Sequence, residues 1–99
     1  MLKKLCSLLL IIICFSAVAM AADKKFTLVI DAGHGGKDAG AVGAFSKEKN
    51  INLSVALAFG RYVEQYCPSV KVIYTRKKDV FIELNGRANM ANRNKADLF

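Results

Sequence analysis

A continuous apolar segment, followed at once by a glycine-rich stretch, limits what this chain can fold into. Residues Phe26 to Ile30 are apolar or β-branched, a pattern typical of a strand buried on both faces of a sheet. Asp31 ends the segment, and five glycines between positions 33 and 43 predict a loop that runs to about Lys49. Strands buried on both faces belong mainly to parallel sheets covered by helices, so we expect an α/β fold.

The segment after the glycine loop has apolar residues at the spacing of a helix. Apolar residues at helical intervals from Ile51 to Val63 predict a helix that begins near Asn50. Either Asn50 or Ser46 is expected to cap that helix, because both side chains accept hydrogen bonds from free backbone amides. Pro68 ends the pattern because proline has no amide hydrogen and its ring blocks the preceding turn.

Further strand and helix patterns complete a βαβ-type alternation. Residues 70–74 predict a second strand, residues 76–79 a polar turn and residues 82–94 a short amphipathic helix. Residues 97–99 resemble the opening of a third strand. The sequence therefore predicts a largely parallel or mixed sheet flanked by helices, incomplete in this chain. Sites in such sheets lie beyond the carboxyl ends of the strands, so the glycine loop is expected at the functional edge.

The first 21 residues have the layout of a secretory signal peptide. Lys3 and Lys4 precede an apolar run, and small residues up to Ala21 form a cleavage signal. A membrane anchor is the alternative, but the run is shorter than the roughly 20 apolar residues that span a bilayer. We expect residues 22–99 to be the exported domain, in the periplasm, cell envelope or cell exterior. Cys67 would then be its only cysteine, a small apolar filler without a disulfide partner.

The charge of the chain is positive, and its glycine loop matches no phosphate-binding motif. Removal of Lys3 and Lys4 with the signal peptide lowers the formal net charge from +7 to +5. The remaining basic residues are spread along the chain, which favours a solvated face over a nucleic-acid site. Gly36-Lys37 is followed by Asp38 where the P-loop needs serine or threonine, and the dinucleotide fingerprint also fails. We therefore predict no nucleotide cofactor and no nucleic-acid partner.

His34 and Glu48 are the candidate metal ligands. His34 is the only histidine, and flanking glycines let the backbone bend sharply and expose its ring. Glu48 lies at the predicted helix start, where an ordinary carboxylate also interacts favourably with the helix dipole. Histidine and carboxylate are both normal zinc ligands, but a catalytic zinc site has three protein ligands. Spacing alone leaves the structural and the metal-binding interpretations of Glu48 open.

Several separate stretches resemble one enzyme family in its own order. The segment from Val29 to Ala41 (VIDAGHGGKDAGA) resembles the opening of the N-acetylmuramoyl-L-alanine amidase catalytic domain, a zinc-dependent cell-wall amidase family. Three later stretches also resemble that domain: Glu48-Lys49-Asn50, Thr75-Arg76 with Asp79, and Leu84 through Arg87 to Phe99. The resemblance begins at about Leu28 and reaches the last residue.

The resemblance implies a zinc cofactor, with His34 and Glu48 as ligands and peptidoglycan as the substrate. The reaction would be hydrolysis of the amide between N-acetylmuramic acid and the L-alanine of the stem peptide. The family pattern continues into a second zinc-binding histidine and a catalytic glutamate, neither of which this sequence contains. We therefore expect no catalytic base in this chain, which reads as truncated and inactive alone. A non-catalytic exported domain that binds wall peptide or metal is the alternative.

Two arginines belong to the similar stretches without a role that the resemblance assigns. Arg76 and Arg87 are expected near the edge of the site. A structural role is the other interpretation, with the arginines pairing with Asp79 or Glu83.

Overall fold

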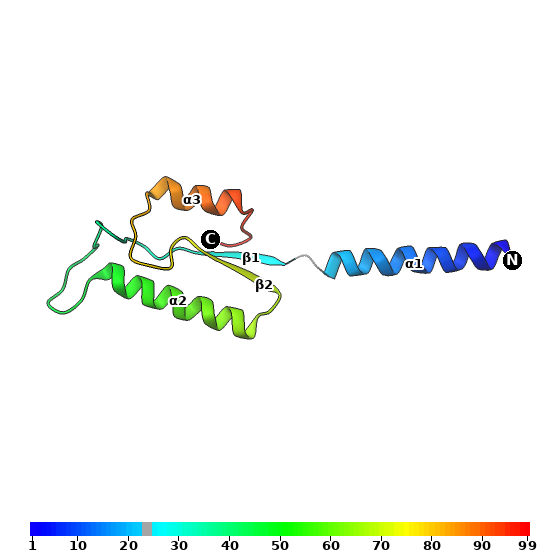
Figure 1. Ribbon diagram of the computed structural model, residues 1–99, viewed down its shortest axis with the longest axis horizontal. Helices are drawn as coiled ribbons and strands as arrows, with labels where there is room; N and C mark the ends of the chain where they lie inside the picture. The colour runs from blue at the N-terminus through cyan, green and yellow to red at the C-terminus, as the bar shows by residue number, and fades with distance from the viewer. Residues whose placement is uncertain (23–24) are drawn as a thin grey trace.

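The computed structural model describes residues 1–22 and 25–99, with side chains described for residues 1–13 and 25–99. Its elements follow in the order α1 (Leu2–Ala22), β1 (Phe26–Ile30), α2 (Glu48–Tyr66), β2 (Val70–Tyr74) and α3 (Leu84–Arg93). Figure 1 shows α2 and α3 on opposite sides of the strands. This is the α/β arrangement that the alternating pattern predicts.

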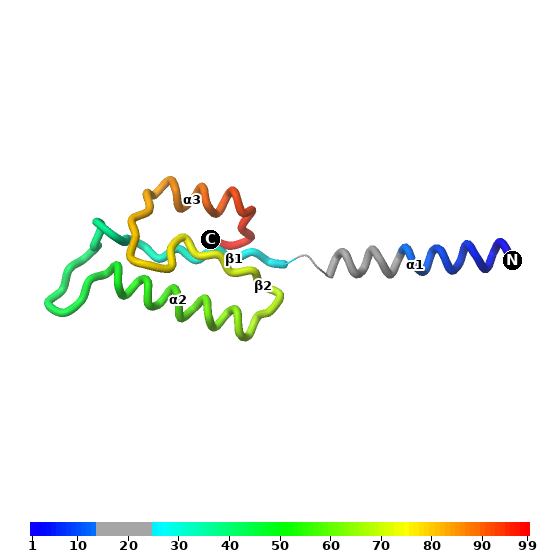
Figure 2. Tube along the Cα trace, viewed as in Figure 1, coloured from blue at the N-terminus to red at the C-terminus, as the bar shows by residue number. Residues whose placement is uncertain are grey.

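The strands β1 and β2 pair in parallel, as predicted. Their register runs from Phe26 opposite Val70 to Ile30 opposite Tyr74. Leu98 makes a parallel bridge with Leu28, and the amide of Val29 donates to the Leu98 carbonyl at 2.9 Å. Figure 2 shows the carboxyl terminus lying beside β1. β1 is therefore flanked on both edges, and the expectation of strand pairing by residues 97–99 is confirmed at Leu98.

The core lies between β1 and α2. Leu28, Ile30 and Ala32 are buried from the strand side, and Ala56 and Val63 are buried from the helix side. A pleated strand presents alternate residues to one face, so these three positions of the β1 segment share one face. Val29, at 2% exposure, occupies the other face, which α3 covers. Burial on both faces explains the continuous apolar run.

The helix α2 begins earlier than predicted and without a side-chain cap. It starts at Glu48, and its N-cap, Lys47, makes no side-chain cap hydrogen bond. The prediction of Asn50 or Ser46 as the cap is therefore wrong. The physical reason lies in the glycine loop: the Glu48 amide donates to the Ala41 carbonyl at 2.9 Å, and the Lys49 amide donates to the Ala39 carbonyl at 3.1 Å. Loop carbonyls thus satisfy the free amides that a cap would serve.

The end of α2 agrees with its prediction, although the role expected for Cys67 does not. The helix ends at Tyr66, two residues before Pro68. Cys67 is exposed and donates its amide to the Val63 carbonyl at 2.8 Å. The prediction of a buried apolar filler is therefore wrong, because this position lies beyond the helix face that packs on the sheet. The predicted helix at 82–94 is confirmed with narrower bounds, Leu84–Arg93.

Close packing of α2 on β2 depends on the small size of Gly60. A Cβ atom at this position would overlap the hydroxyl and ring carbons of Tyr74. We expect Gly60→Ala to lower the free energy of unfolding by about 1–3 kcal/mol, because added volume displaces the helix or the ring. Urea unfolding measures the loss, and Gly60→Ala combined with Tyr74→Ala should recover part of it. Unchanged stability in the single variant would show that the ring moves aside freely.

The amino-terminal segment is helical from Leu2 to Ala22. Figure 1 shows α1 lying apart from the other elements. Among the described residues, none of the helices combines the length and apolar character that crossing a membrane demands. The predicted cleavage before Ala22 remains a prediction, and Asp23 and Lys24, which follow it, lie outside the described residues.

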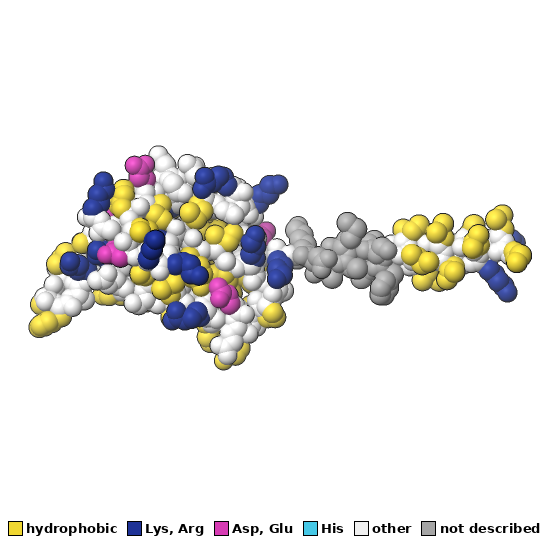
Figure 3. Space-filling model, viewed as in Figure 1, with side chains coloured by type: hydrophobic (Ala, Val, Ile, Leu, Met, Phe, Trp, Pro, Cys, Tyr) yellow, Lys and Arg dark blue, Asp and Glu magenta, His cyan; other side chains and the backbone are white. Residues whose placement is uncertain are grey.

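The basic side chains do not gather into one block. Lysine and arginine side chains are distributed over the visible face of the described part, with a few acidic side chains between them (Figure 3). Two arginines depart from this surface pattern, since Arg76 and Arg87 are only 3% and 5% exposed.

Candidate metal site

The loop after β1 turns sharply at His34. His34 itself has a positive φ of 62°, and Gly35 and Gly36 follow with φ values of 130° and 57°. The amide of Gly35 donates to the Asp38 carbonyl at 2.8 Å, and the amide of Asp38 donates back to Gly35 at 3.0 Å. This tight turn brings Asp38 beside the imidazole, in agreement with a backbone bent by glycines.

The structure brings His34 and Glu48 together. Nε2 of His34 lies 3.2 Å from Oε1 of Glu48, although the two residues come from opposite ends of the glycine loop. Their side chains are 32% and 42% exposed, so solvent reaches both. The interpretation of Glu48 as only a helix-dipole carboxylate is incomplete, because its carboxylate also faces the imidazole.

Each of the two side chains is also held through its second polar atom. Nδ1 of His34 lies 2.9 Å from Oδ2 of Asp38. Oε2 of Glu48 accepts a hydrogen bond from the Ala41 amide at 2.8 Å. Asp38 is fixed in turn, because its Oδ1 accepts from the Gly40 amide at 3.1 Å. The loop therefore aims Nε2 and Oε1 at one shared point.

The charges at this point act on one another. The hydrogen bond with Asp38 is the largest influence on His34 and raises the pKa of its imidazole, with Glu48 adding to the effect. The hydrogen bond from the Ala41 amide lowers the pKa of Glu48, and the bond with His34 lowers the pKa of Asp38. Both carboxyl groups are therefore ionised at neutral pH, which suits binding of a cation.

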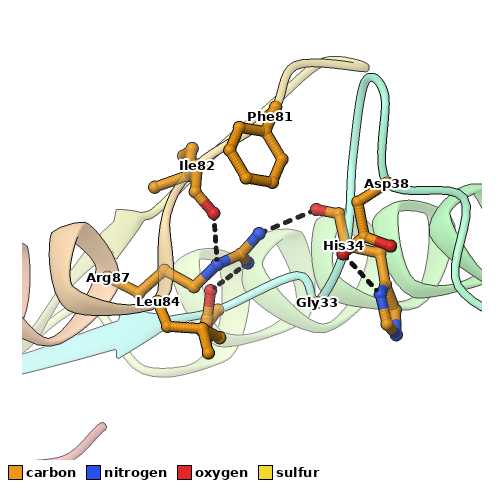
Figure 4. Close-up of a pocket in the computed structure, with 8 residues that line it drawn as sticks. Gly33, His34, Asp38, Phe81, Ile82, Leu84 and Arg87 are labelled. Carbon is orange, nitrogen blue, oxygen red and sulfur yellow. Dashed lines mark hydrogen bonds and ion pairs between the residues drawn. The ribbon is translucent and has the colours of Figure 1, made fainter.

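A cavity of about 230 Å³ lies beside the imidazole. Its polar lining includes Asp31, His34, Asp38 and Arg87, and its apolar lining includes Phe81, Ile82 and Leu84. Figure 4 shows Phe81 and Ile82 on the opposite side of Arg87 from the β1 strand, with His34 and Asp38 at one end of the group. The cavity thus joins the glycine loop to the start of α3.

The two arginines do not make the carboxylate pairs that the sequence suggested. Arg87 pairs with Asp31 at 2.7 Å and not with Glu83, so that expectation is wrong. Asp79 instead pairs with Lys49 at 2.7 Å and accepts from the Gly36 amide at 2.7 Å. The reason is tertiary: Arg87 points from α3 toward the end of β1, where the Asp31 carboxylate lies.

Sequence reasoning missed Asp38 and Ala41 as partners of the candidate ligands. Asp38 follows His34 by four residues, and that spacing alone gives no contact outside a helix. The contact arises from the Gly35–Asp38 turn, which the glycine content indicates only in general terms. Ala41 acts through its backbone amide, for which side-chain identity carries no signal.

The fold and the site together define an α/β domain whose polar side chains gather beyond the carboxyl end of a parallel strand. Residues 28–99 match the N-acetylmuramoyl-L-alanine amidase family profile, and this chain belongs to that family. The matched range confirms the resemblance that the sequence shows from about Leu28 onward.

Curated relatives and solved structures agree with this assignment. The chain is 38% identical over 78 residues to the amidase AmiC of Escherichia coli O6:H1, covering 78% of this chain and 18% of that protein. It is 39% identical over 72 residues to the sporulation-specific amidase of Bacillus subtilis, covering 73% of this chain and 28% of that protein. The chain therefore spans less than a third of either relative.

The structural likeness extends over most of the described domain. The catalytic domain of CwlV, an amidase from Bacillus (Paenibacillus) polymyxa, superposes with a TM-score of 0.70 at 43% identity, covering 73% of this chain and 41% of that one. An amidase from Clostridium difficile 630 superposes with a TM-score of 0.71 at 35% identity, covering 76% and 41%.

Proposed function

We propose that residues 22–99 supply the N-terminal part of the catalytic domain of an exported, zinc-dependent hydrolase. The substrate would be the peptidoglycan amide between N-acetylmuramic acid and the L-alanine of the stem peptide. Family membership supports this reaction, and the relatives described above carry that activity in their names. The observation that carries the metal part of the proposal is the 3.2 Å approach of His34 Nε2 to Glu48 Oε1.

The donor set suits zinc. Ligand atoms bound at about 2.0–2.2 Å in a tetrahedral site are separated from each other by about 3.3–3.6 Å. The observed 3.2 Å separation is close to that range, so little movement would be needed to accept a metal. Asp38 holds the other ring nitrogen at 2.9 Å, the usual carboxylate partner of a metal-bound histidine.

The residues of this chain would prepare the ligands and not perform the proton transfers. With Nδ1 of His34 donating to Asp38, release of the Nε2 proton would leave the Nε2 lone pair available to bind metal. The Ala41 amide keeps Oε2 of Glu48 engaged and presents Oε1. When bound, zinc would polarise the scissile carbonyl and lower the pKa of a bound water to about 7.

We assign no catalytic base within these 99 residues. His34 is the only histidine, and among the side chains described, those of residues 1–13 and 25–99, no group of three His, Cys, Asp or Glu is arranged to hold a metal. The family resemblance implies a further histidine and a glutamate for which this sequence has no counterpart. We therefore propose that the chain alone does not hydrolyse peptidoglycan.

An exported location fits the proposed substrate, because peptidoglycan lies outside the cytoplasm. The basic start at Lys3 and Lys4 and the apolar run after it support a signal peptide over residues 1–21. Peptidoglycan would then be reached only after export, and residues 22–99 would be the part that meets it.

Zinc titration tests the metal proposal on the 99-residue chain. We expect His34→Ala to abolish measurable binding and Glu48→Gln to weaken it at least about tenfold, because a two-ligand site cannot lose either donor. Calorimetry at neutral pH measures both effects. Glu64→Gln is the matched control, since Glu64 is exposed on the same helix and bonds only to Tyr74 among the described side-chain contacts. Equal affinity in all four proteins would contradict the proposal.

A further inference from the structure

We infer that Arg87 and Arg76 are positioning residues for His34, which they fix by binding the backbone carbonyls around it. The inference rests on the proposed metal-binding role of His34. It assigns to two buried cations a task that neither the family match nor the relatives' names describe. Both side chains are almost fully buried, at 5% and 3% exposure.

Arg87 binds the backbone of His34 itself. Its Nη2 donates to the His34 carbonyl at 2.9 Å, and its Nη1 donates to the Ala32 carbonyl at 2.7 Å. Nε donates to the Ile82 carbonyl at 3.1 Å, which ties the guanidinium to the segment before α3. Figure 4 shows the guanidinium lying between the Ile82 carbonyl and the His34 backbone.

Arg76, two residues after the end of β2, binds the same stretch of backbone. Its Nε donates to the Ala32 carbonyl and its Nη2 to the Gly33 carbonyl, both at 2.9 Å. Nη2 also donates at 2.9 Å to the carbonyl of Lys49, the residue after Glu48. Arg76 therefore connects the backbone beside one candidate ligand to the backbone beside the other. Three consecutive carbonyls, at positions 32, 33 and 34, are held by two arginines, one in the segment after β2 and one in α3.

These hydrogen bonds explain how His34, a non-glycine residue, keeps a positive φ. His34 has a φ of 62°, a conformation that costs a side-chain-bearing residue free energy unless its surroundings impose it. The planar guanidinium donates in fixed directions, so it fixes the orientation of the peptide groups that it binds. Holding the carbonyls before and after Cα of His34 fixes the direction in which the imidazole leaves the backbone.

Asp31 orients Arg87 in turn. Its Oδ1 lies 2.7 Å from Nη1 of Arg87 and accepts from the Thr75 hydroxyl at 2.7 Å. The chain of contacts therefore runs from Thr75, the residue after β2, through Asp31 and Arg87 to the His34 backbone. Lysine cannot reproduce it, because a single ammonium group lacks the second arm that reaches the His34 carbonyl.

The test compares zinc affinity, the backbone shifts of His34 and stability in the full chain. We expect Arg87→Lys and Arg76→Lys each to weaken zinc binding by about 10- to 100-fold, the range for loss of a residue that orients a ligand. The backbone chemical shifts of His34, measured without metal, should move in the same variants. Asp31→Asn, which keeps the shape of the side chain, should give a smaller change in the same direction.

Val63→Ala is the control for a merely structural role. Val63 is buried in the core on the half of α2 that lies away from Glu48. Its variant should lose stability in urea while keeping the zinc affinity and the His34 shifts of the unmodified protein. If the arginine variants behave like Val63→Ala, or change nothing, the positioning role is overturned.

The outcomes separate this inference from the proposed function. If the unmodified chain binds no zinc, the proposed metal site fails, and the His34 shifts alone decide whether the arginines fix its backbone. If one arginine variant does not fold, the other and Asp31→Asn give the same comparison.

Discussion

Gly40→Ala should weaken zinc binding by about 100-fold or more, because both candidate ligands would be displaced. A Cβ atom on Gly40 would lie 2.6 Å from Oε2 of Glu48 and 2.7 Å from Cδ2 of His34. The backbone there also has a φ of 64°, which disfavours alanine. The steric overlap and the unfavourable φ would both displace the side chains of His34 and Glu48, and neither requires a change in the hydrophobic core. Calorimetric titration with zinc measures the loss.

Gly43→Ala is the matched control for this prediction. Gly43 lies in the same loop, and a Cβ atom there would approach only Ser46, at an ordinary distance of 3.5 Å. We expect its zinc affinity to equal that of the unmodified chain. If Gly40→Ala also keeps full affinity, the space between His34 and Glu48 is not the site of metal binding.

Among the variants considered, Gly35→Ala should lower the free energy of unfolding the most, by about 3 kcal/mol or more. Gly35 has a φ of 130°, a region that L-residues with a side chain rarely adopt. Its added Cβ atom would overlap the Val80 carbonyl oxygen and lie 2.9 Å from Nε of Arg76. The buried guanidinium cannot move aside without breaking its hydrogen bonds to the Ala32 and Gly33 carbonyls, and the Val80 oxygen moves only with its peptide group. Urea unfolding followed by circular dichroism measures the effect.

Gly86→Ala provides the comparison for the stability experiment. Gly86 lies within α3, and a Cβ atom there would meet only Ile82, at 3.5 Å. Alanine is the better helix former, so this variant should be neutral or more stable by up to about 1 kcal/mol. A similar loss in both variants would mean that the chain tolerates no change at glycine, and the specific contact with Val80 would not explain the result.

Most of the fold could be predicted because its signals are local. The apolar run of β1 and the helical spacing of α2 each reflect burial on a known face, and both elements form as expected. The end of α2 before Pro68 follows from the chemistry of proline alone. The helix start could not be predicted, because carbonyls of Ala39 and Ala41 replace a capping side chain there.

In the candidate site, too, residue types could be predicted from the sequence, whereas contacts made by the folded loop could not. Histidine and carboxylate are residue types that can bind zinc, and the family resemblance implies that role for His34 and Glu48, whereas spacing alone left the role of Glu48 open. Their 3.2 Å approach depends on how a loop of thirteen intervening residues folds back, and spacing does not specify that path. Asp38 was missed because its contact with His34 comes from a glycine turn.

The amino-acid sequence alone specified the order of strands and helices and the glycine loop, because each depends on residue type or short-range periodicity. It was the family resemblance that implied His34 and Glu48 as ligands. Only the tertiary structure decided which groups form hydrogen bonds with His34 and Glu48 and with the backbone around them. The expected partners of Arg76 and Arg87 were Asp79 and Glu83, whereas the structure directs both guanidinium groups to the carbonyls after β1 and pairs Arg87 with Asp31. Carbonyl groups occur at every residue, so the sequence carries no mark of the ones that a buried cation will bind.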